Sequence, residues 1–344
     1  MHAIGTEFVN YLLLISFPTV VTMRVLITGG AGYIGSFTAR KLTERGHQVT
    51  VFDNLSAGHR GNVPAAQLQV GDLKDIDQLD QALIANRIEA VMHFAASCYV
   101  GESVTNPMKY YTNNLHNSMQ LIERMRRHRI GRFVFSSSCA VYGLPNADTL
   151  DESHPTQPVN PYGHTKLATE YMLTDYAPAY GLGYASLRYF NAAGASADGH
   201  YGEKHDPETH LIPLVLDVAL KKKPSISIYG TDYPTPDGTC IRDYVHVEDL
   251  AEAHALALER IEPGQGAVYN VGSGTGSSVQ EVIRTCEEVT GNRIATVKAD
   301  RRAGDPPRLV ASASKIRAAL GWKPKYPDLH SIIETAWNWH QRQG

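Results

Sequence analysis

The fold class of this chain follows from the stretch Thr28-Gly29-Gly30-Ala31-Gly32-Tyr33-Ile34-Gly35. An apolar run typical of a buried strand, Arg24 to Thr28, precedes it, and a segment with helical periodicity, Ile34 to Arg45, follows. Glycines spaced three apart permit a tight turn, let backbone amides approach a pyrophosphate and allow close helix packing. Such glycines also occur in ordinary turns, but their position between a strand and a helix favours a dinucleotide-binding loop.

A carboxylate further along the chain indicates which dinucleotide is bound. Asp53 ends the predicted strand Gln48 to Asp53, where it can accept hydrogen bonds from the adenosine ribose hydroxyls. The same carboxylate would repel a 2′-phosphate, and no arginine stands beside it before Arg60. We therefore predict NAD rather than NADP, and Asp72 and Leu73 beside the adenine. The alternative is that Asp53 only caps its own turn.

Apolar runs alternate with amphipathic segments beyond the glycine loop, which predicts strands and crossover helices of a doubly wound parallel α/β sheet of Rossmann type. Further predicted strands are Ala90 to Phe94, Arg132 to Ser136 and Tyr184 to Tyr189, and a further predicted helix is Leu115 to His128.

The composition changes after Phe190, where long loops rich in Gly, Pro, His and acidic residues begin. The run Ala267 to Val271 resembles a strand that returns to the main sheet. We therefore predict a smaller, discontinuous second domain. The expected NAD-binding domain comprises 23–190 plus 246–276, and the expected substrate domain comprises 191–245 plus 277–344.

Bulk properties exclude several classes of protein. A chain of 344 residues exceeds the usual size of one hydrophobic core, and 43% hydrophobic with 19% charged residues is typical of a globular enzyme. The net charge of −3 predicts no general attraction to nucleic acid or anionic membrane. Four scattered cysteines without a CxxC pair argue against disulfides and favour the cytoplasm. No HExxH helix or compact Cys/His cluster stands out, so no metal is predicted.

Residues 1–22 differ from the rest of the chain. Their apolar stretch, Tyr11 to Val21, is short for a membrane span and contains Pro18. No Lys or Arg precedes it and no small-residue cleavage site follows, so we interpret 1–22 as an upstream start or added leader before Met23. A secretory signal is the weaker alternative.

Tyr162 and Lys166 lie four residues apart in a segment opened by Pro161, and therefore share one face of the predicted helix. Such a pair can deprotonate an alcohol. A tyrosine with a pKa near ~10 needs a drop of roughly 3 units, or about 4 kcal/mol. A cation about 4 Å away supplies roughly 4 kcal/mol at an effective dielectric of 20, so Lys166, helped by a positive nicotinamide ring, would overcome a modest desolvation penalty. A tyrosine and a lysine four residues apart also occur by chance on helix surfaces, but the glycine loop and the serines 136–138 favour catalysis. Ser138 is expected to hydrogen-bond the reacting hydroxyl, and the alternative is that it only caps a turn.

Together these motifs resemble the extended short-chain dehydrogenase/reductase superfamily, and within it the UDP-galactose 4-epimerases. The resemblance runs almost from Met23 to the C-terminus. It rests on Gly-Gly-Ala-Gly-Tyr-Ile-Gly-Ser at 29–36, Ser-Ser-Ser at 136–138, Val-Tyr-Gly at 141–143, Pro-Tyr-Gly at 161–163, Arg-Tyr-Phe-Asn at 188–191, Tyr-Gly-Thr-Asp-Tyr-Pro-Thr at 229–235, Asp-Gly-Thr at 237–239 and Arg-Asp-Tyr-Val-His at 242–246.

The resemblance implies a role for each matching residue. Tyr162 would be base and acid, Lys166 its electrostatic partner and a ribose ligand, and Ser138 the hydroxyl that orients the sugar. The implied NAD contacts are Gly29, Gly32, Tyr33, Ile34, Gly35, Asp53, Asn54, Asp72, Leu73, Phe94, Ala95, Ala96, Asn113, Ser136, Tyr162, Lys166 and Tyr189. The implied UDP-sugar contacts are Ser138, Tyr162, Asn191, Leu211, Tyr229, Arg242, Tyr244, Arg302, Asp305 and Leu309.

Physical chemistry supports the implied nucleotide contacts of the arginines and of Tyr229. The forked donors of arginine suit a diphosphate, and the Tyr229 ring can stack on uracil. Each arginine taken alone is as well explained by a surface salt bridge.

Three positions depart from the family pattern. Cys98 follows Phe94-Ala95-Ala96-Ser97 where many relatives have a lysine, which puts that pyrophosphate contact in doubt. Phe37 replaces a histidine common after the glycine loop. Leu309 aligns with the position that gates the sugar pocket, and it is smaller than the tyrosine of enzymes restricted to galactose, so N-acetylated hexoses are a second expected substrate class.

The resemblance implies reversible C4 epimerisation of UDP-galactose and UDP-glucose through a 4-keto sugar and NADH, in a homodimer built from helices after Asn113 and around Tyr162. A nucleotide-sugar dehydratase is disfavoured because Cys139 and Ala140 replace the Asp-Glu of dehydratases. A non-catalytic NAD-sensing module is disfavoured because Tyr162 and Lys166 are both present.

Overall fold

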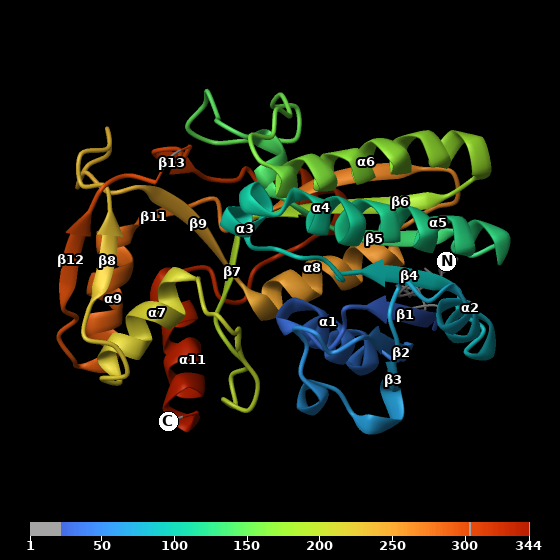
Figure 1. Cartoon of the computed structure of the whole chain (residues 1–344), viewed down its shortest axis with the longest axis horizontal. Coiled ribbons are helices and arrows are strands. Elements are labelled where there is room, and N and C mark those ends of the chain that lie inside the picture. The colour runs from blue at the N-terminus through green and yellow to red at the C-terminus, as the bar shows by residue number, and fades with distance from the viewer. Residues whose placement is uncertain (1–21, 303, 344) are drawn as a thin grey trace, which may run out of the picture.

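The computed structural model describes residues 22–302 and 304–343, which form two lobes side by side (Figure 1). The leader predicted at residues 1–22 lies outside the described residues, apart from Thr22, and stays a prediction. Among the described residues, no helix combines the length and apolar character that crossing a membrane requires.

The large lobe is built on a seven-stranded parallel sheet with the order β10-β6-β5-β4-β1-β2-β3, which confirms the predicted fold class. The return of a late strand to this sheet is confirmed too, because β10 pairs with β6. The strands are β1 (Arg24–Thr28), β2 (Gln48–Asp53), β3 (Leu68–Val70), β4 (Ala90–His93), β5 (Arg132–Ser138), β6 (Gly183–Tyr189) and β10 (Gly266–Val271).

Side chains of successive strand residues point to opposite faces of the large sheet, and a hydrophobic core covers each face. In β1, Val25 and Ile27 enter one core and Leu26 the other. The first core includes residues of α1 (Tyr33–Glu44), α8 (Val247–Glu259) and α10 (Ser314–Leu320). The second includes residues of α2 (Ile76–Ala85), α5 (Asn117–Arg127) and α6 (Pro161–Tyr180).

Short elements connect these larger ones in the large lobe. They are the single-turn helices η1 (Arg60–Asn62), η2 (Ala65–Gln67) and η4 (Cys139–Tyr142), the helices α3 (Val100–Thr105) and α4 (Pro107–Tyr110), and the π-helical segment η3 (Tyr111–His116).

Two predicted boundaries differ from the structure for identifiable reasons. Strand β5 continues to Ser138 because its ladder with β6 extends to the pair Ser138 and Tyr189. The predicted helix from Leu115 is preceded by the π-helical turn η3, and regular α-helix begins at Asn117. Both differences lie beside the predicted catalytic residues.

The small lobe contains two further sheets. Strand β9 (Ile241–His246) pairs in parallel with β7 (Asn191–Ala193) and β13 (Arg308–Leu309), and antiparallel with β11 (Gly276–Ser278). Strands β8 (Ile226–Tyr229) and β12 (Thr296–Ala299) form a parallel pair. The helices α7 (Leu211–Ala219), α9 (Val279–Thr290) and α11 (Leu329–Arg342) contribute to a third core.

The chain crosses between the lobes more often than the predicted domain bounds describe. Helix α10 and the fully buried Trp322 belong to a core of the large lobe, although both lie within the segment 277–344 that was expected to serve the substrate domain. The indole nitrogen of Trp322 donates to the backbone oxygen of Asp249 in α8, at 2.8 Å. This segment therefore supports both lobes.

Candidate active site

The glycine loop joins β1 to α1 in a conformation that its glycines permit. Gly29 has a φ of +73°, and a Cβ there would lie 2.5 Å from the backbone nitrogen of Ala95. A Cβ on Gly35 would lie 2.4 Å from the backbone oxygen of Gly29. Gly32 caps α1 without a side chain, so the first backbone amides of the helix remain available to an anion.

Tyr33 and Ile34, two predicted cofactor residues at the start of α1, also contact other parts of the protein. The Tyr33 hydroxyl donates to the backbone oxygen of Gly194 at 2.6 Å. Ile34 packs against the core of the large lobe. These contacts join the start of α1 to the loop after β7.

Asp53 ends β2 and supports the loop directly. Its carboxylate accepts hydrogen bonds from the backbone amides of Ala31 at 2.9 Å and Leu55 at 2.8 Å. This is the turn-capping role kept as an alternative in the sequence analysis. It leaves acceptor capacity on both oxygens, because each carboxylate oxygen can accept two hydrogen bonds.

The neighbouring predicted adenine-side residues are held by local bonds. The amide of Asn54 donates to the carboxylate of Asp72 at 3.0 Å. Leu73 is buried in the core beneath them. The structure thus brings Asp53, Asn54 and Asp72 to one edge of the sheet.

The segment after β4, which includes Phe94, Ala95 and Ala96, is fastened by an asparagine that sequence analysis passed over. Asn114 is buried, accepts from the backbone amide of Ser97 at 2.8 Å and donates to its backbone oxygen at 2.9 Å. The predicted Asn113 makes longer contacts of 3.2 and 3.3 Å. The sequence shows two adjacent asparagines, Asn113 and Asn114, and only the fold shows that Asn114 is the one that fastens Ser97.

Helix α6 presents the predicted catalytic pair. Its start is defined by Pro161 at the first helical position and by the side chain of Asn160, which accepts from the amide of Gly163 at 2.9 Å. Tyr162 is half-buried at this end. Lys166 is buried one turn later, and its ammonium donates to the backbone oxygen of Ser136 at 2.7 Å.

The electrostatics of the pair depend on burial. The Lys166 ammonium lies 5.8 Å from the centroid of the Tyr162 ring. Burial raises the pKa of Tyr162 well above 10, the nearby Tyr189 and Cys98 raise it further, and the Ser138 hydroxyl opposes the increase. Burial lowers the pKa of Lys166 to about 8. Among the described residues, burial therefore dominates the pKa of Tyr162, and the lowering expected from Lys166 together with the positive nicotinamide ring stays a prediction.

Three serines at the end of β5 connect this pair to the next strand. The Ser136 hydroxyl is hydrogen-bonded to the hydroxyl of Tyr189. The Ser138 hydroxyl accepts from the backbone amide of Ala140 at 3.1 Å, so it also caps the following turn. The structure brings the predicted residues Ser136, Ser138, Tyr162, Lys166 and Tyr189 together at the carboxyl ends of β5 and β6.

A buried ion pair behind the catalytic pair was missed in the sequence. Glu170 lies one turn beyond Lys166 and forms a salt bridge with Arg188 of β6, at 2.5 Å, with both side chains almost fully buried. Glu170 also accepts from the Ser137 hydroxyl. Arg188 donates to the Tyr142 hydroxyl at 3.0 Å. These bonds join α6 to β5 and β6, and the recurring Arg in the Arg-Tyr-Phe-Asn motif was the available signal.

The predicted nucleotide residues lie in the small lobe and are paired with other protein groups. Arg242 forms a salt bridge with Asp305, and both belong to the predicted set. The guanidinium of the exposed Arg302 lies 4.1 Å from the centroid of the Tyr229 ring, which is 40% exposed. Arg242 also lies close enough to Cys139 to oppose the effect of burial, which raises the pKa of that thiol to about 12.

The remaining predicted substrate residues flank strand β9. The amide of Asn191 donates to the backbone oxygen of Asp243 at 2.9 Å, and Tyr244 is buried opposite Asn191 in the ladder. Leu309 pairs with Arg242 in the ladder of β13 and packs against a small core that Cys139, the residue after Ser138, also contacts. Leu211 begins α7 and packs against the core of the small lobe.

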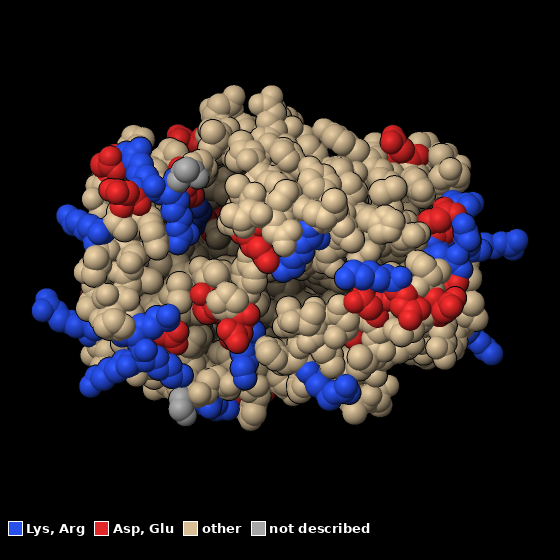
Figure 2. Space-filling view, viewed as in Figure 1, with Lys and Arg blue, Asp and Glu red and all other residues tan. Residues whose placement is uncertain are grey.

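Asp243 is a further residue that sequence analysis did not select. It is fully buried and accepts hydrogen bonds from the backbone amides of Ser273, Gly274 and Ala311, at 2.7, 3.1 and 3.0 Å. It therefore holds the loop after β10 against β9. Figure 2 shows the surface hollowed where the lobes meet, with basic side chains at the edge of the hollow on the side of the small lobe.

A compact cluster of possible metal ligands was also missed. Glu203, His205, Glu208 and His210 each offer one ligand atom, and these atoms all lie within 4.8 Å of one another. These residues form neither an HExxH helix nor a Cys/His spacing, and the alternation of glutamate and histidine was the available signal.

Comparisons with known proteins agree with this arrangement. Residues 25–272 match the model of the NAD dependent epimerase/dehydratase family. The UDP-glucose 4-epimerase of Halalkalibacterium halodurans is 51% identical over 93% of this chain and 96% of its own length. The crystal structure of the Brucella ovis UDP-glucose 4-epimerase in complex with NAD is similar with a TM-score of 0.88 and 47% identity, over 92% of this chain and 98% of that one. The UDP-Glc/GlcNAc 4-epimerase of Campylobacter jejuni is similar with a TM-score of 0.81 and 40% identity, over 93% and 99%.

Proposed function

Because the chain belongs to the NAD dependent epimerase/dehydratase family, we propose that it is an NAD-dependent isomerase that interconverts UDP-galactose and UDP-glucose at C4. One observation carries the proposal. Ser138, Tyr162 and Lys166 converge at the carboxyl ends of two parallel strands of the sheet that also carries the glycine loop. In open α/β sheets this edge is where ligands bind.

The residues around the glycine loop fit NAD. A Cβ at Gly29 or Gly35 would collide with backbone atoms, so the loop keeps its close turn only with glycine, and the amides at the start of α1 face outward. Asp53 would accept from the ribose hydroxyls of the adenosine, while Lys166 and Tyr189 lie on the side of the sheet where the catalytic residues meet. When bound, NAD supplies a hydride acceptor that can return the hydride.

Tyr162 is the group that takes and returns the proton of the C4 hydroxyl. Its raised pKa makes the neutral phenol the resting form, and removing that proton requires positive charge beyond Lys166. The positive nicotinamide ring has the required sign. Ser138, next to the phenol, orients the sugar hydroxyl, and Lys166 is itself held in place by the backbone of Ser136.

Inversion at C4 requires that the sugar turn while the nucleotide stays bound. Arg242 and Arg302 would bind the diphosphate, and Tyr229 would stack on uracil. All three lie in the small lobe, apart from the proton-transferring group. A 4-keto sugar would rotate about its bond to the diphosphate and present its opposite face to Tyr162, which would return the proton there. Bound NAD would supply the reversible hydride acceptor that leaves the net redox change at zero. Remote binding of this kind leaves the reacting ring loosely held.

The decisive experiment uses purified full-length chain with UDP-galactose and no added electron acceptor. We expect UDP-glucose to form until both sugars reach equilibrium, as measured by chromatography of the nucleotide sugars. A 4-keto-6-deoxy product would identify a dehydratase instead. No conversion by a folded, NAD-loaded protein would contradict the proposal.

UDP-N-acetylhexosamines are a second substrate class, supported by Leu309. This side chain packs against the small core that Cys139 also contacts, and it occupies less space than a tyrosine. The similar Campylobacter jejuni protein is titled a UDP-Glc/GlcNAc 4-epimerase. We expect turnover of UDP-N-acetylgalactosamine by the wild type and a lower ratio of N-acetylated to plain substrate turnover in Leu309→Tyr. Inactivity of the wild type on the N-acetylated sugar would remove this class.

A homodimer through the helices after Asn113 and around Tyr162 is supported by exposed apolar side chains on this edge of the large lobe. There α4, η3 and α5 follow one another end to end, and α6 lies beside them (Figure 1). Their exposed large hydrophobic residues, with those of α3, are Val100, Val104, Met108, Tyr111, Met119, Tyr171 and Tyr180. Sedimentation should give twice the chain mass, and Tyr171→Glu together with Met119→Glu should give the monomer. A wild-type monomer would contradict this assembly.

We place the enzyme in the cytoplasm and expect it to bind neither nucleic acid nor membranes. The four cysteines are all free, which suits a reducing compartment.

A further inference from the structure

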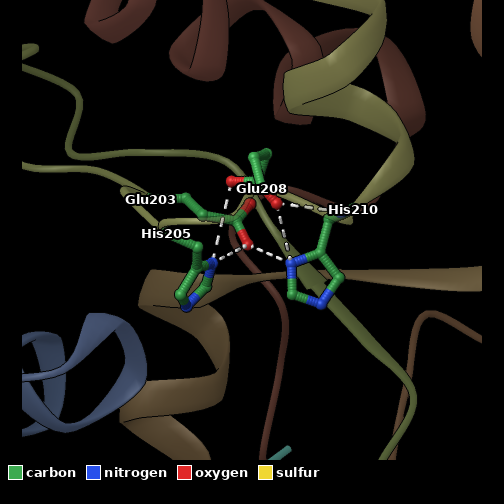
Figure 3. Close-up of side chains that lie close together, drawn as sticks. All are labelled: Glu203, His205, Glu208 and His210. Carbon is green, nitrogen blue, oxygen red and sulfur yellow. Dashed lines mark hydrogen bonds and ion pairs between the residues drawn. The ribbon is translucent and has the colours of Figure 1, made fainter. Parts of the chain in front are cut away.

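The loop that leads into α7 carries four metal-ligating side chains that the proposed reaction does not use. The segment is Glu203-Lys204-His205-Asp206-Pro207-Glu208-Thr209-His210. Figure 3 shows the two carboxylates and the two imidazoles pointing toward one another. Glu203 is almost fully buried, whereas the side chain of His210 is 47% exposed and gives the cluster an open side.

The contacts inside the cluster are close without forming a closed set of hydrogen bonds. Nδ1 of His205 lies 3.2 Å from Oε1 of Glu203 and 3.7 Å from Oε2 of Glu208. Nδ1 of His210 lies 2.5 Å from Oε1 of Glu203 and 3.4 Å from Oε1 of Glu208. Yet Oε1 of Glu203 and Nδ1 of His205 are buried and have no partner of good hydrogen-bond geometry among the described residues. These two buried polar atoms are the unpartnered groups that a bound cation would satisfy.

These separations match the edges of a tetrahedral metal site. Zinc–ligand bonds of about 2.0–2.2 Å to histidine nitrogen and carboxylate oxygen place neighbouring ligand atoms roughly 3.3–3.5 Å apart. The separation of Nδ1 of His205 from Oε1 of Glu203 and that of Nδ1 of His210 from Oε1 of Glu208 lie within a few tenths of an ångström of that value. Nδ1 of His210 and Oε1 of Glu203 are closer, at 2.5 Å, and would move apart around an ion. We propose that Glu203, His205, Glu208 and His210 bind one Zn²⁺ ion, each through one ligand atom.

The charge of the cluster favours a cation at its centre. Two carboxylates with two neutral imidazoles carry a charge of −2, which one divalent ion neutralises. A mixed imidazole and carboxylate set suits zinc and its neighbours in the first transition series better than Mg²⁺ or Ca²⁺, which prefer oxygen ligands alone.

The surroundings show what such an ion would do. The indole nitrogen of Trp339 in α11 donates to the backbone oxygen of Glu203 at 3.0 Å. The Tyr99 hydroxyl, from the large lobe, donates to the backbone oxygen of Pro207 at 3.0 Å. The His205 ring packs edge-on against Tyr33 of the glycine-loop helix. The ion therefore fixes a loop that contacts both lobes and leads directly into Leu211.

Four protein ligands leave no open position for a substrate, which is the arrangement of structural rather than catalytic zinc sites. The ion is thus proposed to hold the loop in its contacts with Tyr33, Tyr99 and Trp339, without contacting the sugar. This role is independent of the proposed epimerase activity, and metal content reports on it even if the substrate differs.

The test starts with untagged full-length protein, stripped with a chelator and then given either ZnCl₂ or CoCl₂. We expect about one zinc ion per chain by elemental analysis, a higher unfolding temperature with zinc, and the intense visible absorption of tetrahedral Co²⁺. His205→Gln and His210→Asn should each weaken zinc binding at least tenfold. His200→Asn, which changes an exposed histidine of the preceding turn, should bind like the wild type.

A stripped wild-type chain that neither takes up zinc nor gives the Co²⁺ absorption overturns the proposal, whatever the variants do. Zinc affinity equal to the wild type in both cluster variants also overturns it. If a variant fails to fold, Glu208→Gln provides the same comparison with a smaller change of shape.

Discussion

The two halves of the candidate site are built in different ways. The group that moves protons sits on regular elements, where Lys166 bonds to the backbone of Ser136 and the adjacent Glu170 is paired with Arg188 inside the protein. The groups expected to bind the nucleotide come from separate strands and loops, and the clearest contact, between Arg302 and Tyr229, is exposed to solvent.

This difference separates positioning from binding. A proton-transfer group must be held in place before the substrate arrives, because small displacements lower its rate steeply. A nucleotide site can exchange its internal ion pairs for contacts with the ligand, since exposed pairs contribute little stability. Variants of the first region should therefore lower kcat, and variants of the second should raise KM.

The largest effect is expected for Tyr162→Phe. Removing the only proposed proton carrier should lower kcat by about 10²- to 10⁴-fold with little change in KM. The measurement is a steady-state assay of UDP-galactose conversion, with Tyr171→Phe on the exposed face of the same helix as the matched control. Activity close to wild type in Tyr162→Phe would remove the distinction between the two regions.

Lys166→Met should lower kcat and also raise stability below pH 8. The folded pKa of Lys166 is lowered from 10.5 to about 8, so the unfolded chain binds more protons between these values and wild-type stability rises with pH there. Below pH 8 the buried charge destabilises the fold by about 3 kcal/mol, which methionine avoids.

Thermal unfolding of Lys166→Met and wild type at several pH values between 6.5 and 10 checks this. The advantage of the variant should be greatest below pH 8 and shrink as the pH approaches 10.5. A constant difference across the range would show that the lysine is not desolvated in the native protein.

Arg242→Gln tests the second region where it is most buried. Losing a charged donor to the diphosphate should raise KM for UDP-galactose about tenfold to a hundredfold, with kcat changed much less. The inhibition constant of UDP, compared between the variant and the wild type, gives the loss of nucleotide affinity directly. A fall in kcat with an unchanged KM would assign Arg242 to the chemistry instead.

The smallest effect is expected for Arg302→Ala. An exposed cation–π contact contributes about 0.5–1 kcal/mol, so KM should rise only roughly two- to five-fold. Arg301→Ala is the matched control, because that neighbour pairs with Asp232 and stacks on Tyr233 instead. Equal effects of both variants would mean that Tyr229 and Arg302 form no specific part of the nucleotide site.

Local patterns were sufficient to predict the sheet and the placing of Tyr162 and Lys166 on one helix. A glycine at positive φ between a strand and a helix, and a tyrosine and lysine four apart in a capped helix, are short-range features set by backbone sterics and helical geometry. Asn114 and the pair of Glu170 and Arg188 were not predictable in this way, because their roles depend on partners that the fold brings close from 17 and 18 positions away.

The chain's local chemistry therefore sufficed for the Rossmann-type architecture and the preference for NAD, because each depends on neighbours within a turn or a strand. The balance of charge in the site was decided in three dimensions. Burial of Tyr162 and Lys166, the pairing of Arg242 with Asp305 and the meeting of Glu203 with His205 and His210 all follow from packing. Desolvation and Coulomb energies depend on distances that no linear spacing specifies.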